Sequence, residues 1–213
     1  MTYDGIVSRY LNRPLSRPAA RAVAHTPITP NAVTAFTLLL AVAAGAVTAA
    51  GWNIAGGIAI QAVSVIDGVD GELARLRNLT TRFGAVFDAV TDRYADAAMI
   101  AGMTVYAVRF EDWPRAEVVG TLALAAALIV SFSRARIEAD LGGGMGGDAV
   151  FGLASRDVRS LIAAVGTIAG QCYWTLALLA AIGALTVAWR LAYLRFSAAA
   201  AEYRATRGQP PSG

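Results

Sequence analysis

Residues 160–189 form a run of thirty residues without a charged side chain, and residues 32–50 form a second uncharged run. A helix needs about 20 apolar residues to cross the hydrocarbon core of a bilayer. Thirty helical residues extend for about 45 Å, which is too long for one span. The longer run therefore predicts two membrane spans, with a break near Gly170 and Gln171.

The composition agrees with a membrane domain. Hydrophobic residues make up 56% of the 213 residues and charged residues only 15%, which is too apolar for an ordinary soluble domain. Further spans are predicted from Ile54 into Asp67, over 83–108 and over 118–132. Thr29 is suited to the N-cap of the first span and Pro30 to its first position. We expect an all-α integral membrane protein with six transmembrane helices.

The arginines predict the orientation of these spans. All 18 basic residues are arginine, and the formal net charge is +3. With six spans, fifteen arginines lie on one side of the membrane and only Arg109 and Arg115 on the other. Basic residues are enriched on the cytoplasmic side, so both termini are predicted to lie there, in the cell membrane. The same bias accounts for the positive charge, and no nucleic-acid partner is expected.

The N-terminal residues lack the continuous apolar segment of a signal peptide. Arginines at positions 9, 13, 17 and 21 alternate with apolar residues such as Leu11 and Leu15, a pattern typical of a helix in the membrane interface. The predicted divisions are an interfacial amphipathic helix over 1–27, a six-helix membrane domain over 28–200 and a disordered tail over 201–213. The single His25 and the single Cys172 are interpreted as a surface residue and a packing residue.

Four carboxylates stand out in this apolar chain: Asp67, Asp70, Asp88 and Asp92. At membrane depth a carboxylate is costly unless it is paired, bound to a metal or facing water. On a helix, positions 67, 70, 71 and 74 share one face, and positions 84, 88, 92 and 96 share another. Two antiparallel helices joined through 77–82 would bring these two faces together.

Several carboxylates at close range require a cation if all are to stay ionised. Oxygen ligands without nearby Cys or His favour Mg²⁺, Mn²⁺ or Ca²⁺. A diphosphate held by such an ion beside Arg75 would be ready for displacement at phosphorus, with a free carboxylate accepting a proton. Two alternatives are a structural role, with the carboxylates paired to Arg75, Arg77 and Arg82, and a cation transporter. A transporter does not account for Gly71 and Ala74 at fixed offsets.

The eight motif positions read D-x-x-D-G-x-x-A-R-x8-G-x3-D-x3-D and are Asp67, Asp70, Gly71, Ala74, Arg75, Gly84, Asp88 and Asp92. This string resembles the signature of the CDP-alcohol phosphotransferase (CDP-alcohol phosphatidyltransferase) family. The Thr-Pro-Asn-x-x-Thr start of the first span, the interfacial helix and the six spans are also similar to that family. The resemblance implies an enzyme that transfers a substituted phosphate from a CDP-linked alcohol to an acceptor alcohol and releases CMP.

The resemblance also implies roles for individual residues. Asp67, Asp70 and Asp88 would hold Mg²⁺ (or Mn²⁺), and Asp92 would reach a second ion or act as the catalytic general base. The implied cytidine-diphosphate site consists of Gly71, Ala74, Arg75 and Gly84, with Asn31 and Thr34 as weaker candidates. The family also implies a homodimer.

The acceptor is less clearly indicated. Arginine suits phosphate recognition because its planar fork binds two oxygens at once. The candidates for a phosphorylated acceptor are Arg134, Arg136, Arg156, Arg159 and Arg195; as an alternative, these arginines only reflect the cytoplasmic bias.

The residues around the motif, Asp96 among them, resemble the di-myo-inositol-phosphate-phosphate synthase branch of the family, which implies CDP-inositol as donor and inositol phosphate as acceptor. The alternative is a phospholipid synthase with a CDP-lipid donor, such as CDP-diacylglycerol or its archaeal equivalent, and inositol phosphate or glycerol phosphate as acceptor.

Overall fold

The computed structural model describes residues 8–140 and 155–196, and this part of the chain is helical, without a strand. A short π-helical turn, η1 (Ser8–Asn12), leads into α1 (Arg13–Val23). The longer helices are α2 (Pro30–Ala49), α3 (Asn53–Leu76), α4 (Arg82–Phe110), α5 (Ala116–Asp140), α6 (Arg156–Ile168) and α7 (Cys172–Phe196). The first seven residues of the predicted interfacial segment and the predicted C-terminal tail lie outside the described residues.

Four of these helices are long and apolar enough to cross a membrane: α2, α3, α5 and α7. Helix α4 has 29 residues, but its first half carries part of the acidic motif, and α6 has only 13 residues. The prediction of an all-helical chain with several membrane spans is therefore confirmed. Of the six predicted spans, the described residues support four by length and composition, namely α2, α3, α5 and α7.

Two local predictions about helix ends are confirmed. The Thr29 hydroxyl accepts a hydrogen bond from the Ala32 amide at 3.2 Å, and Pro30 is the first residue of α2. The long uncharged run breaks where expected, since α6 ends at Ile168 and α7 begins at Cys172. Between them Gly170 has a φ of +65°, a backbone conformation that glycine adopts without steric cost.

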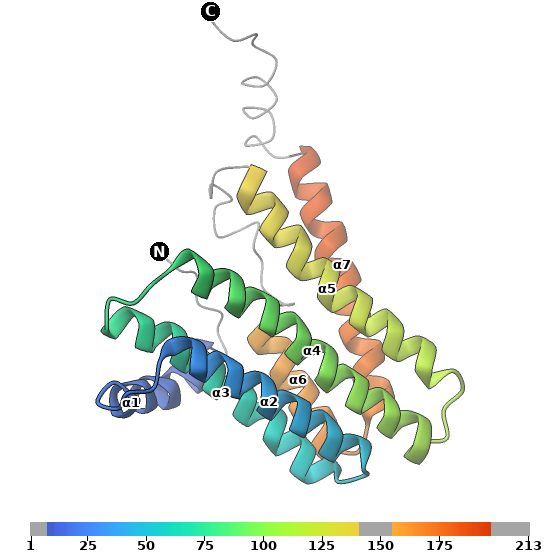
Figure 1. Ribbon diagram of the computed structural model, residues 1–213. Coiled ribbons are helices and arrows are strands. Elements are labelled where there is room, and N and C mark those ends of the chain that lie inside the picture. The colour runs from blue at the N-terminus through green and yellow to red at the C-terminus, as the bar shows by residue number, and fades with distance from the viewer. Residues whose placement is uncertain (1–7, 141–154, 197–213) are drawn as a thin grey trace, which may run out of the picture.

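Helix α2 packs against α3 and α4, α3 against α6, and α5 against α7 (Figure 1). The pairs α2/α3 and α3/α6 are antiparallel, whereas α2/α4 and α5/α7 are parallel. The crossing of α2 and α4 depends on two glycines. A Cβ atom on Gly102 would lie 2.2 Å from the Gly45 carbonyl oxygen, so the two backbones touch directly. Small residues permit such close approach between membrane helices.

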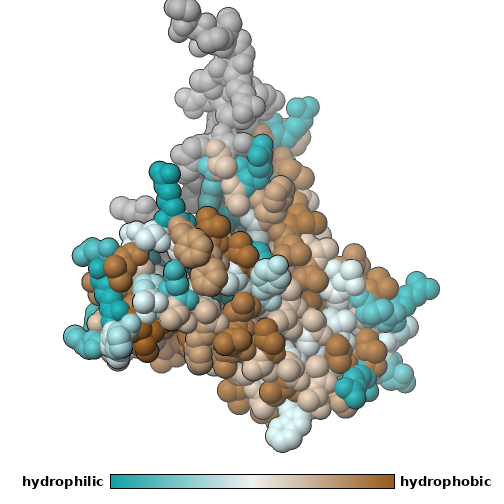
Figure 2. All heavy atoms as spheres, viewed as in Figure 1, coloured by the Kyte–Doolittle hydropathy of each residue, from teal (hydrophilic) through white to brown (hydrophobic). Residues whose placement is uncertain are grey.

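The outer surface of the bundle is apolar. Figure 2 shows hydrophobic residues over the body of the bundle and hydrophilic residues gathered toward its edges. Leu39, Leu122 and Leu185 are among the large apolar side chains that are mostly exposed. Such a surface is suited to contact with lipid, whose acyl chains are as apolar as these side chains.

Successive helices run in opposite directions, so each helix from α2 to α7 either begins or ends at the end of the bundle that carries the acidic motif. Helices α2, α4 and α6 begin at this end, and α3, α5 and α7 finish there (Figure 1). The segment 77–81 joins α3 to α4 at this end, beside the start of α2. The acidic motif spans the last turns of α3 and the first half of α4 and therefore lies at or near this end.

Candidate active site

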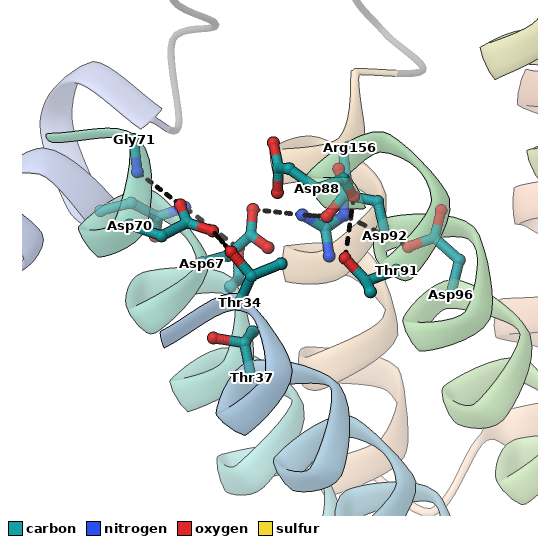
Figure 3. A network of polar contacts seen from close by, with 12 residues as sticks. Thr34, Thr37, Asp67, Asp70, Gly71, Asp88, Thr91, Asp92, Asp96 and Arg156 are labelled. Atoms are coloured by element: carbon teal, nitrogen blue, oxygen red, sulfur yellow. Dashed lines mark hydrogen bonds and ion pairs between the residues drawn. The ribbon is translucent and has the colours of Figure 1, made fainter. Parts of the chain in front are cut away.

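Three carboxylates converge between α3 and α4. Asp67 comes from α3, and Asp88 and Asp92 come from successive turns of α4 (Figure 3). One oxygen from each lies within 4.8 Å of the others, and all three side chains are half-buried. The expected meeting of the two acidic faces is confirmed for these residues, which we call the acidic cluster.

Asp70 lies on the same helix but is engaged elsewhere. One carboxylate oxygen accepts a hydrogen bond from the Gly71 amide at 2.5 Å, and the other accepts one from the Thr34 hydroxyl. Thr34 stands on α2 and also donates to the Pro30 carbonyl at 3.2 Å. To join the acidic cluster, the Asp70 carboxylate would have to turn away from Thr34.

The positive charge that faces the acidic cluster comes from α6. Arg156 forms ion pairs with Asp67, with Asp92 at 2.8 Å and with Asp96 at 3.4 Å. One turn later, Arg159 pairs with Asp96 at 2.7 Å, and both of these side chains are buried. Buried charges need such partners because removal from water is costly.

The arginines closest to the motif in sequence have other partners. Arg75 pairs with Glu72 at 2.8 Å, and Arg77 donates to backbone carbonyls of the chain that follows α1. The structural alternative therefore fails for Arg75 and Arg77, because neither forms an ion pair with the acidic cluster.

The five arginines considered for an acceptor phosphate fall into two groups. Arg156 and Arg159 lie at the acidic cluster, whereas Arg134, Arg136 and Arg195 are exposed near the ends of α5 and α7. Arg134 forms an exposed ion pair with Glu138 at 2.8 Å.

A sixth arginine, Arg190, is not among the residues predicted from the sequence to bind the acceptor. Arg190 of α7 is buried and donates to the Val130 carbonyl at 2.5 Å and to the Ser133 hydroxyl at 2.8 Å, both on α5. In the sequence Arg190 directly follows a long apolar run, so it resembles an ordinary flanking arginine.

A pocket of about 200 Å³ lies between α2, α3 and the start of α4. Its lining includes all six residues expected at a cytidine-diphosphate site: Asn31, Thr34, Gly71, Ala74, Arg75 and Gly84. Asp70 and Asp88 also line it, and Asp88 belongs to the acidic cluster as well. The pocket and the acidic cluster are therefore neighbours that share a wall.

The glycine at position 71 keeps part of this pocket open. A Cβ atom there would meet only the Arg75 guanidinium, at 3.7 Å and beyond. No packing contact requires glycine at this position. The space beside the Gly71 backbone is therefore available to a bound group.

The acidic cluster fits a hard divalent cation. Its three carboxylates offer only oxygen ligands, at separations that one ion can bridge, and such ligand sets favour Mg²⁺, Mn²⁺ or Ca²⁺. Asp67, Asp88 and Asp92 are the residues that would hold the ion, and Asp70, the fourth predicted ligand, would join them if its carboxylate turned away from Thr34.

The helical bundle, its apolar surface and the acidic cluster beside a pocket define a membrane enzyme. The family model described as CDP-alcohol phosphatidyltransferase matches residues 27–200. The chain therefore belongs to this family, whose members are transferases of phosphate-containing groups.

Two relatives illustrate the similarity within the family. The chain is 40% identical over 173 residues to the bifunctional IPC transferase and DIPP synthase of Rubrobacter xylanophilus, which covers 78% of this chain and 37% of the relative. It is 36% identical over 167 residues to the phosphatidylinositol phosphate synthase of Mycobacteroides abscessus, covering 78% and 73%. The chain thus spans about a third of the length of the bifunctional relatives.

Solved structures of the Mycobacterium tuberculosis phosphatidylinositol phosphate synthase share the fold. The structure with CDP-DAG bound matches with a TM-score of 0.73 and 28% identity, covering 87% of this chain and 96% of that chain. The structure in complex with manganese and citrate also matches with a TM-score of 0.73, at 27% identity, covering 86% and 90%.

Proposed function

We propose that this protein transfers a substituted phosphate from a CDP-linked alcohol to an inositol phosphate and releases CMP. The observation that carries the proposal is the pocket that contains all six expected nucleotide-site residues and shares Asp88 with the acidic cluster. The inositol phosphate acceptor is supported by the relatives, since both a DIPP synthase and phosphatidylinositol phosphate synthases are among them.

The favoured donor is CDP-inositol. The residues around the motif resemble the di-myo-inositol-phosphate-phosphate synthase branch, and the 40% identity to the Rubrobacter xylanophilus protein agrees with this. The second candidate donor is CDP-diacylglycerol. It is favoured by the structural match to the phosphatidylinositol phosphate synthase with CDP-DAG bound, which covers 96% of that chain.

Each part of the site has a task in this reaction. A bound Mg²⁺ or Mn²⁺ would neutralise charge on the donor diphosphate. Gly71 and Ala74 leave room for the nucleotide, and Arg75 adds positive charge beside the phosphates. Asp92 accepts the proton of the acceptor hydroxyl, whose oxygen attacks the phosphorus that carries the donor alcohol. The bond from this phosphorus to the oxygen of CMP then breaks, and CMP leaves.

The acceptor phosphate is assigned to the basic side of the acidic cluster. Arg156 and Arg159 already lie there, and the buried Arg190 extends the basic region toward α7. Arg134, Arg136 and Arg195 remain candidates at the surface of the same end of the bundle. Arginine forks in this arrangement can hold a phosphate through paired hydrogen bonds.

The membrane setting completes the proposal. Helix α1 and the turn before it lie in the membrane interface, and the site and both termini face the cytoplasm, because the arginine-rich end carries the site. Through its family the protein is further proposed to act as a homodimer with two metal ions per site.

The test is a CMP-release assay on the purified protein in lipid vesicles. CDP-inositol and CDP-diacylglycerol are each offered with inositol phosphate, with glycerol phosphate or without acceptor, in the presence of Mg²⁺ or a chelator. We expect release from one donor that depends on both metal and inositol phosphate, and its loss in Asp92→Asn. Absence of CMP release from both donors, or release with glycerol phosphate alone, contradicts the proposal.

A further inference from the structure

Arg77, the first residue after α3, binds a stretch of backbone far away in the sequence. Its guanidinium donates to the carbonyls of Val23 at 2.9 Å, of Ala24 at 2.8 Å and of Ile28 at 2.6 Å, and also to that of Thr26. Its Nε adds a bond to the Ala24 carbonyl at 3.2 Å. The Arg77 side chain therefore donates hydrogen bonds to four carbonyls between the end of α1 and the start of α2.

The chemistry of arginine explains why this residue can do so. The last carbonyls of a helix have no partner within the helix and carry its negative dipole end. Arginine offers five donors in a rigid planar fork and stays charged, whereas lysine offers a single compact ammonium group. Arg77 therefore closes the end of α1 and, with the same group, fixes the turn that follows.

The other hydrogen bonds described in this turn are local, among them those of the Thr26 hydroxyl, which donates to the Val23 carbonyl at 2.8 Å and accepts from the Ile28 amide at 3.4 Å. Residues 25–29 are exposed, so apolar burial contributes little to their conformation. The apolar contacts nearby join Ala20 of α1 and Val33 of α2 to Val69 and Leu73 of α3, and of the described residues between α1 and α2 only Ala24 packs against them. The local bonds shape the turn, and the hydrogen bonds from Arg77 fix its position relative to the end of α3.

This turn leads directly into one wall of the pocket. Thr29 caps α2, and Asn31 and Thr34 on the first turns of α2 face Gly71 and Ala74 on α3 across the pocket. Arg77 directly follows α3 and hydrogen-bonds to the chain that leads into α2. It therefore links the α2 and α3 walls from outside the pocket. It does not line the pocket itself.

We propose that Arg77 is a positioning residue of the nucleotide site and sets the spacing between the α2 and α3 walls of the pocket. The proposal rests on the proposed function, because it assigns the pocket to the CDP moiety of the donor. A shift of α2 would also move the Thr34 hydroxyl away from Asp70, so the same tie supports the orientation of a motif carboxylate.

The test compares Arg77→Gln and Arg77→Lys with Arg109→Gln. Arg109 is an exposed arginine near the opposite end of α4, so the control removes the same charge away from the site. Three quantities are measured: the steady-state constants for donor and acceptor, the affinity for CMP, and hydrogen exchange of the backbone amides.

For Arg77→Gln we expect about a tenfold rise in the donor KM and a similar loss of CMP affinity, the size of effect that loss of charged hydrogen bonds produces. The kcat and the acceptor KM should stay within about twofold of wild type, because the lost interactions bind the donor equally in the ground state and the transition state. Amides of residues 24–34 exchange faster, while those of α5 and α7 do not change. Arg77→Lys restores the donor KM only in part.

A donor KM and CMP affinity like those of Arg109→Gln would overturn the proposal. So would equal losses in donor KM, acceptor KM and kcat, which would indicate general damage. If Arg77→Gln does not fold, the Arg77→Lys variant tests the proposal instead. Wild-type CMP affinity together with a lower thermal midpoint in this variant would indicate a purely structural role and overturn the proposal. If the wild type turns over neither CDP donor, the proposed function fails, whereas CMP binding and amide exchange still test the role of Arg77.

Discussion

At the scale of single residues, the site depends on a glycine that leaves space in the pocket as well as on charged side chains. Gly71 borders the pocket next to Asp70, and no neighbouring atom except those of Arg75 would meet a methyl group there. In a helix interior, glycine is less favourable than alanine by roughly 0.5–1 kcal/mol. The space beside Gly71 is therefore more readily explained by a ligand than by stability.

Gly71→Ala is expected to separate binding from folding. The thermal midpoint should stay equal or rise, because alanine favours the helix, while the donor KM should rise by about tenfold or more as the methyl group enters the pocket. Thermal unfolding in detergent and the CMP-release assay measure the two effects. Gly68→Ala is the matched control on the same helix, since its Cβ would meet only Ser16, at 3.3 Å. Equal donor KM values for the two variants would contradict this role of Gly71.

Asp70 shows what residue spacing can and cannot predict. The three-residue spacing correctly places Asp67 and Asp70 near one face of α3. The direction of the Asp70 carboxylate depends on Thr34, which lies 36 residues away in the sequence. No periodicity within α3 contains this information.

At the scale of whole elements, the junction between α4 and α7 is fixed by a carboxylate. The Glu111 side chain accepts hydrogen bonds from the Cys172 amide at 2.6 Å and from the Tyr173 amide at 2.9 Å. These are the first amides of α7, which lack partners within the helix and carry its positive dipole end. Trp113 stacks on Tyr173 beside this contact, with ring centroids 5.6 Å apart.

Glu111→Gln should weaken this junction, because the amide side chain has one acceptor oxygen and no charge. We expect a loss of about 1 kcal/mol, which corresponds to a fall of about 2–4 °C in the thermal midpoint, with little change in donor or acceptor KM. Unfolding followed by tryptophan fluorescence measures the shift. Glu117→Gln, an exposed change in the first turn of α5, should lower the midpoint by less, because solvent screens its charge. Equal midpoints for both variants would contradict the capping role.

The elements differ in how far local sequence defines them. The start of α2 was predictable because Thr29 and Pro30 act on adjacent backbone groups. The break at Gly170 was predictable because a single helix would exceed the bilayer thickness. Helix α6, by contrast, gains its functional meaning only from its packing on α3, which brings Arg156 to Asp67.

At the scale of the whole molecule, the alternation of helices places the site at one end and the segments 50–52, 111–115 and 169–171 at the other. Asp112→Cys and Arg82→Cys test the predicted orientation, since both positions are exposed and the native Cys172 is fully buried. We expect a membrane-impermeant maleimide to label the Asp112→Cys variant in intact cells. The Arg82→Cys variant should react only after permeabilisation, and the reverse pattern would contradict a cytoplasmic site.

The sequence alone determined the class of molecule and the chemistry of its site. Apolar run lengths predict membrane helices because a bilayer has a fixed thickness, and the motif spacing predicts facing carboxylates because helices repeat every 3.6 residues. Only the tertiary structure decided which cations meet those carboxylates and which arginine holds the pocket wall. Arg156 and Asp67 are 89 residues apart, and Arg77 and Ala24 are 53 apart. Contacts of this kind arise from helix packing, which no local pattern in the chain encodes.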